Sequence, residues 1–244
     1  MNYPQRIIGF ILDTVFPVVC LGCGSFSTTN RKNYLCKYCL QLIPIKKDLE
    51  CIGCRIKSSL GKTCIGCQSW SLDHLFVVSD YKNKVLEKTI KTLKYRFVRD
   101  LAESIYPLVK RYVYFLAKEK RFSIIADNPV IIPVPLHYRR FNWRGFNQAQ
   151  VIAKIIAGIT NLRTDNTTLI RSSISKPQAE INKKSERLEN MSNQFKISTD
   201  KKIKGKAVLL ADDICTTGAT LNECARILKK AGAKKVIGFV IARG

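Results

Sequence analysis

Apolar positions after residue 73 follow two alternating patterns along the chain. Compact apolar runs predict buried strands over residues 74–81, 129–136, 206–213 and 234–244. Apolar residues at three- and four-residue spacing predict helices over residues 83–95, 99–118, 146–159 and 220–232. In the longest helix the apolar stripe consists of Leu101, Ile105, Leu108, Val109, Tyr112 and Leu116. This alternation predicts an α/β fold with a mostly parallel sheet and helices on both faces.

The first residues and one later stretch do not fit this alternation. Residues 4–16 have the apolar spacing of a short amphipathic helix, interpreted as packing on the protein, with membrane-surface binding as the minor alternative. No transmembrane segment is expected, because the apolar run 7–21 is short, contains Asp13 and is broken by Pro17. The polar stretch 172–194 is interpreted as a surface loop or, alternatively, as a mobile lid over a site.

The 244-residue chain is strongly basic, with 42 Lys and Arg against 18 Asp and Glu and a formal net charge of +24. Such a charge attracts polyanions over long distances, so nucleic acids and phosphorylated small molecules are favoured partners. Charge alone does not decide the matter, since solvated surfaces also accumulate lysine.

Eight of the ten cysteines form four C-x-x-C pairs before residue 68. The pairs are Cys20/Cys23, Cys36/Cys39, Cys51/Cys54 and Cys64/Cys67. This spacing and count predict two structural four-thiolate Zn²⁺ sites, formed either by neighbouring pairs or by alternate pairs in a crossed arrangement. Because the chain shows no export signal, the cysteines are interpreted as metal ligands in a reducing cytoplasm rather than as disulfides. A small N-terminal domain over 1–73 and a larger one over 74–244 are expected.

The segment "VLLADDICTTGAT" places two carboxylates between a buried strand and a turn rich in hydrogen-bond donors. Asp212 and Asp213 follow the strand, and small residues at 218 and 219 allow a phosphate to approach the backbone. Hydroxyl donors come from Thr216, Thr217 and Thr220. The carboxylates suit either two ribose hydroxyls or a Mg²⁺ ion on a pyrophosphate. Together with donors for a 5-phosphate they predict a ribose-phosphate site, although adjacent acids more often only cap a turn.

This segment resembles the phosphoribosyl diphosphate (PRPP) motif of type I phosphoribosyltransferases. Further segments extend the resemblance: "LKYRF", "IPVPLHYRRFNWRGFNQA", "KPQAEIN", "ERLEN" and "FPVVCLGCG". Together they are similar to the ComF family of competence proteins. The resemblance implies a parallel-sheet type I phosphoribosyltransferase fold with a small N-terminal double zinc-ribbon domain, and a role in DNA uptake during natural transformation through handling of single-stranded DNA.

The resemblance also implies roles for individual residues. Asp212 and Asp213 would be the catalytic pair that holds the ribose hydroxyls, with Mg²⁺ accompanying PRPP. The phosphate-binding set would be Thr216, Thr217, Gly218, Ala219 and Thr220. Candidates for the pyrophosphate are Arg139, Arg140 and Arg144, with Lys94 as a weaker candidate. Arginines on a solvated loop are the alternative interpretation.

Three functions remain open at this point. The first is a PRPP-binding protein that handles single-stranded DNA, with proteins of the DNA-uptake machinery as further partners. The second is an active Mg²⁺-dependent phosphoribosyltransferase of nucleotide metabolism acting on an unidentified base. The third is a structural zinc-ribbon adaptor.

The cytoplasm is the expected location, with peripheral association with the inner membrane left open. Candidates in the cysteine region for holding phosphates and stacking bases are Arg31, Lys32, Tyr34, Lys37 and Tyr38.

Overall fold

The computed structural model describes residues 18–26, 34–95, 101–121, 128–172, 194–200 and 202–244. The helix expected over 4–16 and nearly all of the loop or lid expected over 172–194 lie outside these residues. None of the helices in the described ranges has the length and apolar content that a membrane span requires.

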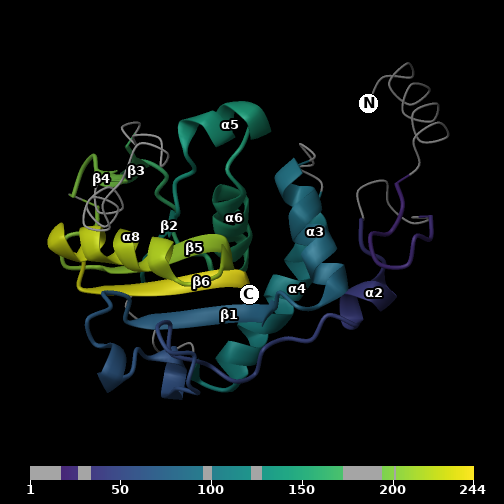
Figure 1. Ribbon diagram of the computed structural model, residues 1–244, viewed down its shortest axis with the longest axis horizontal. Helices are drawn as coiled ribbons and strands as arrows, with labels where there is room; N and C mark the ends of the chain where they lie inside the picture. Colours follow the sequence, from purple (N-terminus) through teal and green to yellow (C-terminus); the bar gives the residue numbers. More distant parts are fainter. Residues whose placement is uncertain (1–17, 27–33, 96–100, 122–127, 173–193, 201) are drawn as a thin grey trace, which may run out of the picture.

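A four-stranded sheet forms the centre of the molecule (Figure 1). Its strands are β1 (His74–Asp80), β6 (Lys235–Arg243), β5 (Ala207–Cys215) and β2 (Val130–Pro133), in that spatial order. All three pairings are parallel, with Leu209 opposite both Ile131 and Ile237. The strand interiors are buried, as expected for a parallel sheet covered on both faces. The predicted parallel-sheet α/β fold is confirmed.

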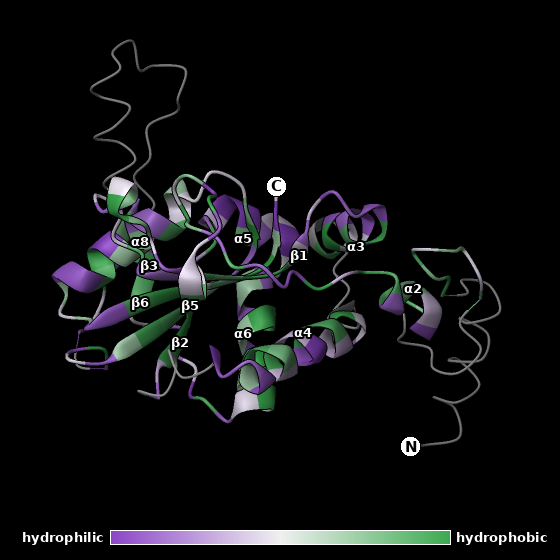
Figure 2. Ribbon diagram, turned by 90° about the horizontal axis from the view of Figure 1, so that it is seen from below, coloured by the Kyte–Doolittle hydropathy of each residue, from purple (hydrophilic) through white to green (hydrophobic). Residues whose placement is uncertain are grey.

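Helices cover both faces of this sheet (Figure 2). The helices are α3 (Lys84–Tyr95), α4 (Leu101–Lys118), α6 (Gln148–Thr160) and α8 (Ala219–Lys230). Alternate side chains of β5 point to opposite faces, so Leu209 joins the core under α4 and α6 while Leu210 joins the core under α8. The helices that the apolar spacing predicts are therefore present. In α4 the predicted stripe is buried from Ile105 to Leu116, and the side chain of Leu101 lies outside the described residues.

Three features differ from the expectation. Residues between the strand predicted over 129–136 and the helix predicted over 146–159, for which no regular element was expected, form the short helix α5 (Tyr138–Arg144). A two-stranded antiparallel hairpin, β3 (Leu169–Arg171) and β4 (Phe195–Ile197), flanks the polar stretch. Strand β5 also continues to Cys215, two residues beyond the predicted end, because β6 extends far enough to pair with it.

The cysteine region packs against the sheet and contains short elements of its own. These are helix α2 (Lys37–Gln41) and the 3-10 turns η1 (Ser59–Gly61) and η2 (Ile65–Cys67). Ile52 and Leu72 belong to the core under α8, and Ile43 and Leu49 belong to the opposite core. The region therefore contributes apolar side chains to both faces of the sheet.

Candidate functional site

A pocket of about 140 Å³ lies beyond the end of β2, between α5, α6, β5 and the start of α8. Five predicted site residues line it: Arg140, Arg144, Asp212, Asp213 and Thr220. It is also lined by Arg171, Asn147 and Gln148, which the sequence analysis did not identify. The pocket therefore combines two carboxylates with three guanidinium groups and two amides.

The two carboxylates come from consecutive residues of β5. Strand β2 ends opposite Ala211, whereas Asp212 still pairs with Val240 of β6. Both acids therefore lie past the end of one neighbouring strand, where the sheet opens into the pocket. One oxygen of Asp212 accepts from the N–H of Asp213 at 2.8 Å, and one oxygen of Asp213 accepts from the N–H of Ile214 at 2.7 Å. These bonds fix the orientation of both carboxylates at the wall of the pocket.

Arginines from two elements bring positive charge to the pocket. Arg140 and Arg144 come from α5, and Arg171 comes from the end of β3. Burial lowers the pKa of Arg171, and the positive charge of Arg140 lowers it further. The pKa of His137, at the start of α5, is likewise lowered by burial and then by neighbouring arginines. This accumulation of positive charge favours an anionic ligand.

The other two pyrophosphate candidates do not join this group. Arg139 does not line the pocket; its Nε donates to Tyr138 Oη at 3.1 Å and its guanidinium lies 5.8 Å from the centre of the Tyr138 ring. Lys94 lies in the last turn of α3, and its side chain is outside the described residues.

Two amide side chains at the start of α6 complete the wall. Asn147 caps this helix, accepting from the N–H of Ala149 and donating to the carbonyl of Val134, both at 3.0 Å. Gln148 accepts from Arg144 Nη1 at 3.2 Å. Its Nε2 is buried and has no acceptor among the described residues. A buried donor in this position is suited to an oxygen of a bound ligand.

The turn over residues 216–218 connects β5 to α8 and packs on the cysteine region. Gly218 has a φ of +84°, and an added Cβ would lie 2.8 Å from Cγ1 of Ile52 and 3.1 Å from the ring of Trp70. Arg55 Nη2 donates to the carbonyl of Thr216 at 2.9 Å. The predicted phosphate turn is thus held from outside by residues near the second pair of C-x-x-C motifs.

The eight paired cysteines form two clusters, each made of neighbouring C-x-x-C pairs. One contains Cys20, Cys23, Cys36 and Cys39, and the other contains Cys51, Cys54, Cys64 and Cys67. In each cluster the four sulfurs lie within 4.8 Å of one another. Tetrahedral Zn²⁺ with Zn–S bonds of about 2.3 Å requires sulfurs about 3.8 Å apart. Sulfurs from different pairs are 3.9 Å apart between Cys23 and Cys36, and 3.5 Å apart between Cys54 and Cys64. Each cluster is therefore formed by neighbouring C-x-x-C pairs, and the alternative in which alternate pairs share an ion is wrong.

Glycines inside two of the motifs make room for these clusters. A Cβ at Gly22 would lie 2.5 Å from the sulfur of Cys39, and a Cβ at Gly53 would lie 2.7 Å from the sulfur of Cys67. Backbone N–H groups donate to the sulfurs of Cys20 and Cys51 at 3.3 and 3.4 Å, which stabilises thiolates. The residues present therefore fit two Zn²⁺ ions.

Three curated relatives resemble most of this chain. Competence protein F of Haemophilus influenzae is 28% identical and aligns with 88% of this chain and 99% of its own length. Competence protein ComFC of Streptococcus pneumoniae is 29% identical, with coverage of 92% and 99%. DNA utilization protein YhgH of Escherichia coli O6:H1 is 30% identical, with coverage of 69% and 71%.

The family model described as the phosphoribosyl transferase domain matches residues 107–244, more than half of the chain. The chain is a ComF-family protein with a phosphoribosyl transferase domain. The matched range contains every lining residue of the pocket. In this ComF-family protein the two cysteine clusters lie outside the match and fit a double zinc ribbon.

Proposed function

We propose that the pocket of this ComF-family protein binds PRPP or a related ribose phosphate together with Mg²⁺, and that the protein handles incoming single-stranded DNA during natural transformation. Membership of the family supports a role in competence. The observation that carries the ligand proposal is the pocket itself, which brings carboxylates and guanidinium groups from separate segments together around one space.

Each wall of the pocket suits a different part of a ribose phosphate. Asp212 and Asp213 would accept hydrogen bonds from the ribose hydroxyls. Thr220 at the start of α8 lines the pocket, and the adjacent turn over 216–218, which lies outside the lining, would offer further N–H groups and hydroxyls to the 5-phosphate. Arg140, Arg144 and Arg171 would neutralise the pyrophosphate. Mg²⁺ supplies further neutralisation of the pyrophosphate when bound.

Thermal unfolding with PRPP and Mg²⁺ tests this assignment. At a ligand concentration of about 100 Kd, binding stabilises a protein by about 2.7 kcal/mol, or roughly 5–10 °C in Tm for a chain of this size. We expect this shift in the wild type and in the control Asp48→Asn, whose carboxylate pairs with Lys57 on the surface. The double variant Asp212→Asn/Asp213→Asn should lose it. An unshifted wild type, or a double variant that shifts fully, contradicts the proposed pocket.

The DNA proposal is tested by its dependence on salt. The net charge of +24 predicts binding to single-stranded DNA that weakens steeply as salt rises, because bound cations are released from the phosphates. Fluorescence anisotropy of a labelled 20-mer between 50 and 200 mM salt measures the slope. Absence of binding at 50 mM salt would remove the DNA part of the proposal while leaving the pocket assignment intact.

The cysteine clusters are proposed to hold structural Zn²⁺. Metal analysis of protein purified under reducing conditions without chelator should give about two Zn²⁺ per chain. A content near zero would show that the thiolates serve another purpose. Such sites need reduced cysteines, which supports the proposed cytoplasmic location.

A further inference from the structure

Helix α5 differs from the other α-helices of the described chain because none of its residues has a packing function in the core. It spans seven residues, "YRRFNWR", and no residue in it is buried. Three of the seven are aromatic and exposed: Tyr138 at 46%, Phe141 at 44% and Trp143 at 57%. Exposing this much aromatic surface on one short helix is unfavourable unless the surface binds a partner.

Three arginines are interleaved with these aromatic rings. Arg140 and Arg144 are four residues apart and both reach the pocket. Arg139 does not line the pocket, and its guanidinium lies 5.8 Å from the centre of the exposed Tyr138 ring, so one positive charge lies beside an exposed ring outside the pocket lining. A segment that combines cationic and aromatic side chains in this way suits an anionic polymer that carries planar rings, which can stack on the aromatic side chains.

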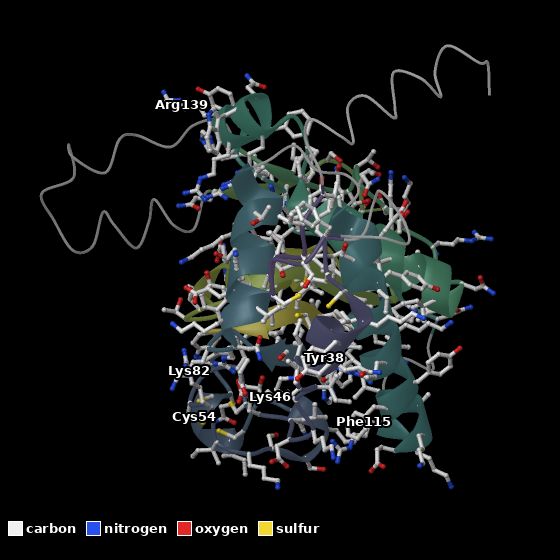
Figure 3. All side chains as sticks on the ribbon, turned by 90° about the vertical axis from the view of Figure 1, so that its right-hand side faces the viewer. Tyr38, Lys46, Cys54, Lys82, Phe115 and Arg139 are labelled. Carbon is white, nitrogen blue, oxygen red and sulfur yellow. The ribbon has the colours of Figure 1, made fainter. Side chains whose placement is uncertain are left out.

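The helix is held firmly enough to act as a platform. His137 caps its start by accepting from the N–H of Arg139 at 3.3 Å, and Gly145 ends it in the left-handed conformation with a φ of 75°. Figure 3 shows Arg139 at the outer end of the molecule, at the opposite end from Cys54 of the second cysteine cluster. The platform is thus separate from the region near Tyr38 in which the sequence suggested base stacking, and there Arg31 and Lys32 lie outside the described residues.

We infer that α5 binds single-stranded DNA, with bases stacking on Tyr138 and Phe141 along one side of the helix and on Trp143 on another, and with the arginines contacting phosphates. This inference rests on the proposed DNA-handling function and gives it a location. Stacking needs unpaired bases, because in a duplex both faces of each base are already covered. Since Arg140 and Arg144 face the pocket, a strand on α5 would pass along its mouth.

Substitution of Phe141 and Trp143, the two rings between Arg140 and Arg144, tests the inference. Removing one stacking aromatic weakens single-strand binding by roughly fivefold or more. We therefore expect Phe141→Ala/Trp143→Ala to lose at least about tenfold in affinity for a dT 20-mer at fixed salt. Binding to a duplex, which depends on charge alone, should change less than about twofold. The matched control is Tyr114→Ala, another aromatic exposed at 61% and lying 5.6 Å from Lys110 on α4.

A second measurement does not depend on the alanine variant folding. The chain has two tryptophans, Trp143 on α5 and Trp70, which packs against the turn at Gly218. A dT 20-mer should quench tryptophan fluorescence in the wild type, and the quenching should disappear in Trp143→Phe while affinity stays within about threefold.

The outcomes separate the two proposals. If the wild type binds the 20-mer but Phe141→Ala/Trp143→Ala binds it equally well, α5 is not the platform and the DNA-handling function survives. If the wild type binds no single strand, both fail. If poly-glutamate displaces the 20-mer and binds with the same dependence on Phe141 and Trp143, α5 is a docking site for an acidic protein and the inference is overturned.

Discussion

The buried Arg243 provides a sharp test of how the cysteine region is joined to the sheet. Its side chain is 2% exposed and pairs with Glu50 at 2.8 Å. It also donates to the carbonyls of Cys51 at 3.1 Å and Ile52 at 2.5 Å. One side chain of β6 thus holds three groups at or next to Cys51, the first cysteine of the second cluster.

Replacement of Arg243 by Met removes the charge and keeps much of the volume. Glu50 retains Lys46 at 2.7 Å, and the carbonyl of Cys51 retains the N–H of Arg55 at 3.1 Å. The carbonyl of Ile52 loses its donor, which costs about 1–3 kcal/mol. Breaking a buried ion pair costs about 3–5 kcal/mol, and the remaining partner of Glu50 favours the lower end of that range. We expect a loss of about 3 kcal/mol, or roughly 6–12 °C in Tm.

Urea and thermal unfolding of the zinc-loaded protein measure this loss. The control is Lys57→Met, which removes an exposed ion pair with Asp48 of similar length, 2.6 Å, in the same region. We expect no measurable change in the control, because exposed pairs contribute little. If Arg243→Met were no less stable than Lys57→Met, the account of a buried charge clamping the cysteine region would be wrong.

Two further predictions concern the turn and a buried carboxyl. Gly218→Ala should destabilise the protein by about 1–3 kcal/mol, because alanine is strained at a φ of +84° and its Cβ would meet Ile52 at 2.8 Å. The control is Gly205→Ala, where φ is +71° and the space around the residue is open. In urea unfolding this control should show only the cost of the backbone strain. Burial alone would raise the pKa of Asp165, but hydrogen bonds from residues such as Thr168 outweigh it and lower the pKa to about 2. The stability that the Asp165 carboxylate contributes should therefore be complete above about pH 4 and be lost as pH falls towards 2. In Asp165→Asn the free energy of unfolding, measured at several pH values, should fall less between pH 4 and pH 2 than in the wild type. An equal fall in both proteins would contradict this prediction.

Regular elements were predictable from the sequence because their apolar spacing is dictated by burial. Strand β5 and helix α8 each have a face that must be covered, and that face is visible in the order of residues. Helix α5 has no buried face, so its sequence lacks the three- and four-residue apolar spacing from which a helix is predicted. Its only local markers are the cap residues His137 and Gly145. The hairpin β3–β4 escaped notice because its strands are three residues long and far apart in the chain.

The part of the candidate site that comes from one continuous segment of the chain was predictable from the sequence. Asp212, Asp213 and Thr220 are found in one segment, so their proximity follows from the chain itself. Arg171 and Gln148 reach the pocket from β3 and α6, and only the tertiary fold brings them there. The pairing of the cysteines could not be settled either, because neighbouring and crossed pairs satisfy the same spacing. The roles of the pocket residues and the boundary between residues 73 and 74 stay predictions.

The packing of the phosphate turn on the cysteine region links the two proposed sites. Ile52 and Trp70 fill the space that a side chain at Gly218 would need, and Arg55 holds the carbonyl of Thr216. Asn222 of α8 also accepts from the N–H of Ser71 at 2.6 Å. We therefore expect that ordering of the second cluster also restricts the turn. Because coupling between binding sites is reciprocal, if Zn²⁺ in that cluster strengthens ribose-phosphate binding, a filled pocket should in turn hold Zn²⁺ more tightly.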